Sequence, residues 1–179
     1  MNRLREQQDM RDWVVGEGYD TFCTLKFKNG YDIDERKAEE VVQLFLQKVD
    51  RVYWGKRVKH DLRCKRFVFL HKGKSGQNTH YHLCIQSLGF QYTFIEVLRK
   101  TWASFYETDT TTSGFELARN TDATGTYITH EWTKLGSRTF CDRLSYTASH
   151  KGIPQYKNIQ KVRRLLTRII HHGRLAAAV

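Results

Sequence analysis

Two histidines one residue apart, His80 and His82, are the side chains whose type and spacing best suit chemistry. They lie inside the apolar run 79–85, which is typical of a β-strand. Alternate side chains of a strand share a face, so both imidazoles should point the same way, while Tyr81 and Leu83 point into the core. Two neutral imidazoles on one rigid face form half of a divalent-metal site. The alternative is that the pair merely contacts phosphates.

His71 is a candidate third ligand because it ends the apolar run that precedes the pair. The segment 72–78 between them is rich in turn residues, so the two runs should form a hairpin that brings His71 beside His80 and His82. Three nitrogen ligands favour Zn, Ni, Co or Mn over Mg, although availability in cells makes Mn or Mg the expected working ion.

Tyr127 is the candidate nucleophile, in the polar segment 125–134. If that segment is helical, His130 and Glu131 lie one turn beyond Tyr127 and Lys134 lies two turns beyond, near one face. A phenol with a pKa of about 10 needs a cation or a base beside it to react at neutral pH. The alternative is that Tyr127 only packs a helix against a sheet.

The composition describes the setting of these residues. A chain of 179 residues is expected to form a single domain over 1–179, with 1–18 as an amino-terminal extension. Its formal charge of +11 attracts phosphate polyanions, either nucleic acid or an anionic membrane. No apolar run approaches the roughly 20 residues needed to span a bilayer, and residues 1–11 lack a signal-peptide core. We therefore expect an intracellular protein without a membrane partner, cytoplasmic if it is bacterial or phage-encoded.

The four cysteines are scattered, without a Cys-Xaa-Xaa-Cys pair. Zinc-finger spacing is therefore absent, and a disulfide framework is not expected in this context. Buried, reduced thiols are predicted for Cys23, Cys64, Cys84 and Cys141.

Periodicity predicts an α+β fold. Strands are expected at 21–28, 67–71, 80–86 and 110–118, the last as a threonine-rich edge strand. One helix should begin after Asp34, and another should open on a capping box of Thr93 and Glu96. The order β-α-β-β-α-β is the ferredoxin-like arrangement, with an antiparallel sheet, both helices on one face and the histidine face open.

Three further elements are predicted beyond this unit. A short helix over 126–134 carries Tyr127, and a possible fifth strand at 138–143 would give a sheet of about five strands. A last helix is expected over 155–174, in a segment that from Arg143 to the end holds eight Lys/Arg and no acids. Basic residues expected to hold a nucleic-acid backbone are Lys26, Lys28, Arg57, Lys72, Lys74, Lys134, Arg163 and Arg164.

Three short motifs resemble those of the HUH endonucleases, and specifically of single-tyrosine rolling-circle replication initiators and replitron-like nuclease domains. Residues 22–27 resemble the first-strand motif, 80–83 the metal motif and 127–130 the tyrosine motif. The resemblance implies a palm-like sheet, dependence on Mg or Mn, and a tyrosine that attacks a phosphodiester of single-stranded DNA. The tyrosine becomes linked to the 5′ phosphate, which initiates rolling-circle replication or transposition. Expected partners are single-stranded DNA, with a hairpin at its origin, and a host helicase and polymerase.

The chain departs from the family pattern at two positions. His130 stands where the tyrosine motif usually ends in Lys, so it would assist catalysis or contact the phosphate. His71 stands where many relatives carry an acidic ligand, so the site would hold three histidines. Two other functions remain open: a metal-independent ferredoxin-like RNA endonuclease using histidine acid–base catalysis, and a non-catalytic binder of single-stranded nucleic acid.

Overall fold

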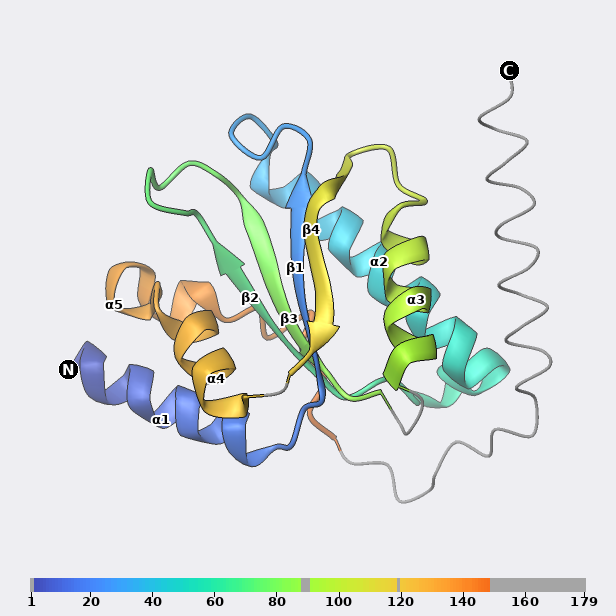
Figure 1. The fold of residues 1–179 in the computed structure, drawn as a ribbon, viewed down its shortest axis with the longest axis horizontal. Coiled ribbons are helices and arrows are strands. Elements are labelled where there is room, and N and C mark those ends of the chain that lie inside the picture. The colour runs from blue at the N-terminus through green and yellow to red at the C-terminus, as the bar shows by residue number, and fades with distance from the viewer. Residues whose placement is uncertain (1, 88–90, 119, 149–179) are drawn as a thin grey trace.

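The computed structural model describes residues 2–87, 91–118 and 120–148, and shows an α+β fold with one antiparallel sheet of four strands (Figure 1). The predicted helix over 155–174, with Arg163 and Arg164, lies outside the described residues.

The sheet contains β1 (Thr21–Phe27), β2 (Arg66–His71), β3 (His80–Ile85) and β4 (Thr108–Leu117), in the spatial order β2-β3-β1-β4. All four strands that periodicity predicts are confirmed within a few residues, and β4 is an edge strand as expected. The pairing register sets His71 beside His80, and His82 beside Thr24 of β1. The histidines therefore come together because two neighbouring strands are in register.

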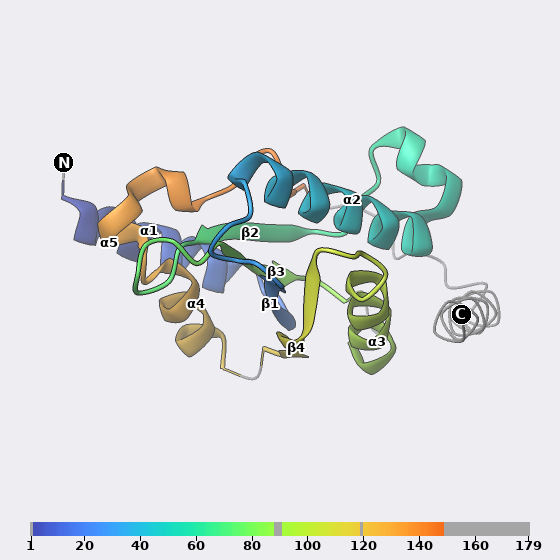
Figure 2. The same cartoon turned by 90° about the horizontal axis from the view of Figure 1, so that it is seen from above.

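Helices α2 (Glu35–Trp54) and α3 (Gln91–Trp102) pack on one face of the sheet (Figure 2). The Asp34 side chain caps α2 by accepting the Lys37 N–H, as predicted. Helix α3 begins at Gln91, so Thr93 is already inside it and the predicted capping box is wrong. The 20-residue α2 is amphipathic, and no helix in the described ranges combines the length and apolarity that a bilayer crossing requires.

The histidine face is covered rather than open. Helix α1 (Arg3–Gly16), helix α4 (Thr121–Thr129) and the single turn α5 (Trp132–Leu135) lie over it and form a second hydrophobic cluster. The expectation of helices on one face only is wrong because this face carries large apolar side chains that require cover. These are Phe22, Phe67 and Phe69, which are buried with the smaller Cys84 in one cluster with Val14, Ile128 and Trp132.

The remaining segments include two 3₁₀ helices, η1 (Gly55–His60) and η2 (Gly136–Thr139). The predicted fifth strand over 138–143 is wrong: η2 occupies its start, and only isolated bridges join Phe140 to Phe69 and Tyr146 to Arg66. The region 126–134 is not one helix, because α4 ends at Thr129 and α5 starts at Trp132.

The cysteines carry free thiols, as predicted. Cys23, Cys64 and Cys84 are buried as predicted, but Cys141 is only partly buried, so the prediction of burial is wrong at this one position. Burial raises the pKa of Cys84 to about 12, so this thiol stays protonated and packs as a small apolar side chain.

Candidate metal centre

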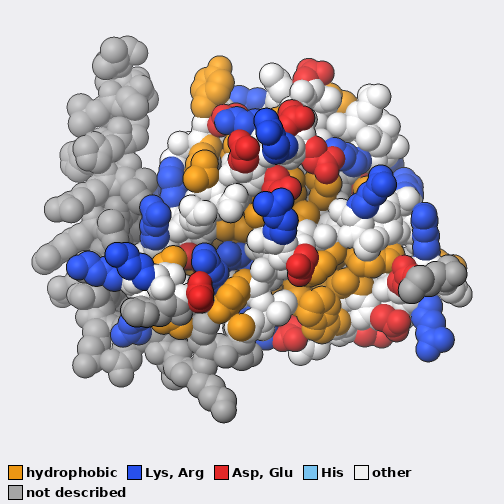
Figure 3. Space-filling model, turned by 180° about the vertical axis from the view of Figure 1, so that it is seen from behind, with side chains coloured by type: hydrophobic (Ala, Val, Ile, Leu, Met, Phe, Trp, Pro, Cys, Tyr) orange, Lys and Arg blue, Asp and Glu red, His pale blue; other side chains and the backbone are white. Residues whose placement is uncertain are grey.

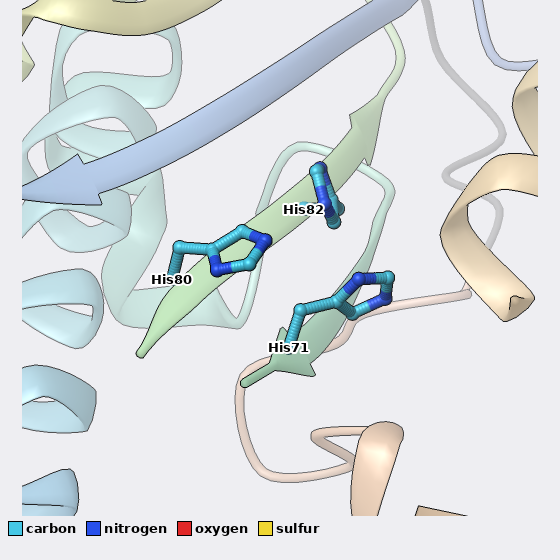
Figure 4. Close-up of side chains that lie close together, drawn as sticks. All are labelled: His71, His80 and His82. Carbon is cyan, nitrogen blue, oxygen red and sulfur yellow. The ribbon is translucent and has the colours of Figure 1, made fainter. Parts of the chain in front are cut away.

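Three imidazoles converge at the hairpin formed by β2 and β3. His71 is the last residue of β2, and His80 and His82 lie on β3 with one residue between them. Figure 4 shows the three rings turned toward a common space. One ring nitrogen from each lies within 4.8 Å of one from each of the others, which is close enough for a single ion to hold all three.

Each histidine uses its other ring nitrogen in a hydrogen bond to the protein. His71 Nε2 donates to the Ile128 carbonyl at 2.7 Å, and His80 Nδ1 donates to the Asn78 carbonyl at 2.8 Å. His82 Nδ1 lies 3.2 Å from the hydroxyl of Thr24. Such outer contacts fix the tautomer and the ring orientation of metal-ligating histidines.

The nitrogens that remain fit a cation. His71 Nδ1 and His82 Nε2 are buried and have no hydrogen-bond partner among the described residues. A buried polar atom without a partner costs about 1–3 kcal/mol. Coordination of a divalent ion would remove that cost, so these residues suit a metal site better than a purely structural core.

Burial also keeps the cluster neutral. It lowers the pKa of His71 to about 4 and the pKa of His82 well below the ordinary value, and the neighbouring imidazoles lower the pKa of His82 further. The pKa of His80 is lowered as well, chiefly by burial. Neutral imidazoles have a free lone pair, so near pH 7 the three side chains need not lose a proton before they bind an ion.

Tyr127 lies beside this cluster. Its ring centroid is 4.9 Å from that of His82 and 6.0 Å from that of Phe22, and the side chain is 51% exposed. Helix α4 therefore places a phenol next to the candidate ligands and leaves it accessible to a substrate from solvent.

His130 and Glu131 follow the end of α4 and close the site. The His130 ring stacks on Tyr127 at 5.3 Å, and its Nδ1 donates to the Tyr127 carbonyl. Glu131 is only 2% exposed, and its carboxylate accepts the N–H groups of Lys72 at 2.8 Å and Gly73 at 2.9 Å. The same carboxylate ties the β2–β3 loop to the segment that carries Tyr127.

A second possible ligand group includes Glu131, which the sequence did not single out as a ligand. Its Oε1 is 3.8 Å from His71 Nδ1 and 3.7 Å from His130 Nε2, and these three residues also satisfy the spacing of a cation site. Its position one turn after Tyr127 is visible in the sequence, but its burial is not, because that burial depends on the break between α4 and α5.

The break in the helix also provides the contact for His71. Carbonyl groups in the last turn of a helix lack an intrahelical partner. Ile128 is in the last turn of α4, and its carbonyl accepts the His71 Nε2–H. One hydrogen bond therefore joins a candidate ligand to the helix of the candidate nucleophile.

Two of the predicted nucleic-acid-binding residues lie close to the histidines. Lys26 pairs with His80 in the register of β1 and β3, and its charge contributes to the lowered pKa of His80 and His82. Lys74 is exposed in the β2–β3 loop, in which Gly73 approaches the His80 ring.

The other predicted contacts are placed differently. The Lys72 ammonium pairs with Glu35 at 2.7 Å, so its charge is partly compensated. Lys28 lies over the exposed ring of Tyr106 at 4.4 Å. Arg57 lies on η1, between the end of α2 and the start of β2, whereas His71 ends that strand, so the structure does not bring Arg57 to the site. Lys134 faces the amino-terminal end of α1.

The face formed by α2 has a mixed character. Figure 3 shows acidic and basic side chains interspersed on this face, and no histidine visible among the described side chains there. The histidine cluster therefore does not open on the α2 face.

No protein-family model, curated protein or solved structure matches this chain. Its function must be inferred from the geometry of its own residues.

Proposed function

We propose that the protein is a metal-dependent endonuclease and strand transferase acting on single-stranded DNA, of the HUH kind. The observation that carries the proposal is the half-exposed phenol of Tyr127, 4.9 Å ring to ring from His82 in a group of three histidines able to hold one ion. The element order β-α-β-β-α-β from β1 to β4 and the strand order β2-β3-β1-β4 support a ferredoxin-like palm.

The chemistry is a transesterification. The Tyr127 oxygen attacks phosphorus and forms a bond to the 5′ phosphate, while the bond from phosphorus to the 3′ oxygen breaks. The phenol gives up its proton to a base, and the released 3′ oxygen takes up a proton to become a hydroxyl. His130 stacks on the Tyr127 ring and is not one of the three proposed ligands, so it would accept the proton or contact the phosphate. The reverse reaction rejoins the strand without an external energy source.

The cofactor would be a divalent ion held by His71, His80 and His82. When bound, such an ion polarises the scissile phosphate and stabilises charge on the leaving oxygen. Mn or Mg is the proposed working ion, and a site of three imidazoles also accepts Zn, Ni or Co. The alternative group of His71, His130 and Glu131 would offer a carboxylate oxygen, which suits Mn and Mg.

The substrate would approach from the side on which Tyr127 is exposed. Lys26, which pairs with His80 in the sheet, and Lys74, exposed in the β2–β3 loop, would contact its phosphates. In this proposal the protein initiates rolling-circle replication or transposition at a site on single-stranded DNA, with a hairpin as a possible part of that site. Unwinding and synthesis would be supplied by a host helicase and polymerase.

The test is the formation of a covalent protein–DNA adduct. The protein is incubated with Mn and a pool of labelled single-stranded oligonucleotides of random sequence, and adducts are identified on a denaturing gel and by intact mass. Tyr127→Phe should form no adduct. Tyr92→Phe is the matched control, because Tyr92 is 74% exposed on α3, which packs on the opposite face of the sheet. An adduct of undiminished yield from Tyr127→Phe would show that this assignment is wrong.

The same experiment separates the other candidate functions. Cleavage of RNA that persists in EDTA, without an adduct, would indicate a metal-independent RNA endonuclease. Binding without cleavage under any ion, unchanged in the double variant His80→Ala and His82→Ala, would indicate a non-catalytic binder.

A further inference from the structure

A concave cavity of about 550 Å³ lies between the amino-terminal end of α1, the turn α5 and η2. Figure 1 shows α5 close to the start of α1, and Figure 2 shows the same arrangement from above. The polar side chains that line the cavity, here called the basic pocket, are those of Arg3, Glu6, Lys134, Ser137 and Arg138.

The basic pocket has an excess of positive charge. Within the described part of the chain, none of Arg3, Lys134 and Arg138 has a carboxylate within 4.0 Å, whereas Arg66 and Lys72 pair with acids at 2.8 and 2.7 Å. The one acid of the pocket, Glu6, accepts the indole N–H of Trp132 at 3.5 Å. Three cations that lack ion pairs and converge on one hollow suit an anion with several oxygens.

The pocket is built on the same support as the tyrosine helix. The Arg3 guanidinium donates to the carbonyls of Thr133 at 3.1 Å and Lys134 at 3.3 Å, which fixes α1 against α5. Four residues further along α1, the Gln7 amide donates to the carbonyl of Thr129, the last residue of α4. The pocket is therefore held in a fixed position relative to Tyr127, with only residues 131–133 between His130 and Lys134.

We propose that the basic pocket is a second phosphate-binding subsite, which holds the backbone of single-stranded DNA away from the reacting phosphodiester. This inference rests on the proposed function in that it takes DNA as the source of the phosphate. The segment 127–138 carries Tyr127 at one end and Lys134, Ser137 and Arg138 of the pocket at the other, so a strand held at Tyr127 would extend to the pocket. The subsite contains no group that distinguishes bases, so it orients the strand without reading its sequence.

The experiment measures binding without catalysis. A fluorescein-labelled single-stranded oligonucleotide is titrated in EDTA over a range of salt concentrations, with the double variant Lys134→Gln and Arg138→Gln. This variant keeps the Arg3 contacts that join α1 to α5. The control is the double variant Lys56→Gln and Lys59→Gln, which removes the same charge from exposed positions on η1 that are not among the predicted DNA contacts.

The association constant K of the pocket variant should fall less steeply with salt than that of the parent. The slope of log K against log salt should become shallower by about 0.7 for each phosphate that the variant no longer neutralises, and by up to about 1.4 in total. The loss of one phosphate contact should weaken binding about 8-fold at about 50 mM salt, if the affinities of parent and variant become equal near 1 M salt. The control should keep the slope of the parent. A parental slope in the pocket variant, or an equal decrease in both variants, would overturn the proposal.

Two further outcomes separate the possible sources of phosphate and the two proposals. If tripolyphosphate raises the melting temperature of the parent but not of the pocket variant, while both bind DNA equally, the pocket takes a free polyphosphate and the DNA subsite is refuted. A lowered slope without any Tyr127 adduct would support the subsite and refute the nickase. A Tyr127 adduct together with a parental slope in the pocket variant would support the nickase and refute the subsite.

Discussion

Replacing His82 with alanine should abolish the stabilisation that a divalent ion gives to the folded protein. His82 is fully buried, its Nδ1 is held by Thr24 and its Nε2 has no partner among the described residues, so the free nitrogen is available to an ion. Because burial keeps this imidazole neutral, binding near pH 7 requires no release of a proton from it.

The size of the effect follows from mass action. An ion at about 100 times its dissociation constant stabilises the folded state by about 2.7 kcal/mol. For a domain of this size, each kcal/mol raises the melting temperature by about 2–4 °C, so the parent should gain about 5–11 °C. Loss of one of three ligands should weaken affinity at least about 100-fold, as even changes outside the ligand set cost 10–100-fold. At the same ion concentration the gain then falls to about 0.4 kcal/mol.

The assay is thermal unfolding in EDTA and in Mn or Zn, with the shift measured within each variant. This comparison cancels the cost of the cavity that alanine leaves in the core. His130→Ala is the informative control, because His130 belongs to the second ligand group and is about half exposed. It should keep most of the shift. A full shift in His82→Ala together with its loss in His130→Ala would refute the three-histidine site and favour the group that contains Glu131.

Two further predictions concern stability. In EDTA the free energy of unfolding should fall as the pH drops from about 6.5 to about 4, because the unfolded chain binds a proton at His71 that the folded protein, with its pKa of about 4, does not. His71 accounts for a decrease of about 3 kcal/mol in the free energy of unfolding over this range. Urea unfolding should therefore show a weaker pH dependence in His71→Leu than in the parent, and an equal dependence would contradict the lowered pKa of His71. Gly125→Ala should destabilise the protein by about 1–3 kcal/mol, because the added carbon would lie 2.8 Å from Val15 and force α1 away from α4. An unchanged midpoint of urea unfolding would show that the two helices do not approach so closely.

Much of the fold follows from local patterns. Alternation predicts β1 because Cys23, Leu25 and Phe27 face the core while Thr24 and Lys26 are partly exposed. Helical spacing predicts α2 for the same reason. The helices α1, α4 and α5 over the histidine face could not be predicted together, because residues 3–16 show little periodicity. Helix α1 is held by contacts distant in sequence, which are the burial of Val14 in the second hydrophobic cluster and the hydrogen bonds of Arg3 and Gln7.

Some residues of the candidate site could be predicted from the sequence and others could not. The sequence predicts that His71, His80 and His82 share a face, since a hairpin in register requires it, and the structure brings Tyr127 to them. The role of Glu131 could not be predicted, because its burial depends on a helix that stops at Thr129 and on amide groups of a loop distant in sequence. The predicted contact of Arg57 with a nucleic-acid backbone stays a prediction, and η1 places this residue where β2 begins, away from His71 at the end of that strand, because a run of basic residues does not reveal the end of the sheet at which it lies.

The hydrogen bond from His71 to the Ile128 carbonyl limits the freedom of the helix that carries Tyr127. Turning or sliding α4 would leave that buried imidazole N–H without an acceptor, at a cost of about 1–3 kcal/mol, which corresponds to a population ratio between about 5 and 150. Tyr127 therefore spends most of its time in register with the histidines before any substrate arrives. For the proposed reaction, the entropy of aligning Tyr127 with the histidines would be lost during folding, so less of it would oppose the encounter with a DNA strand.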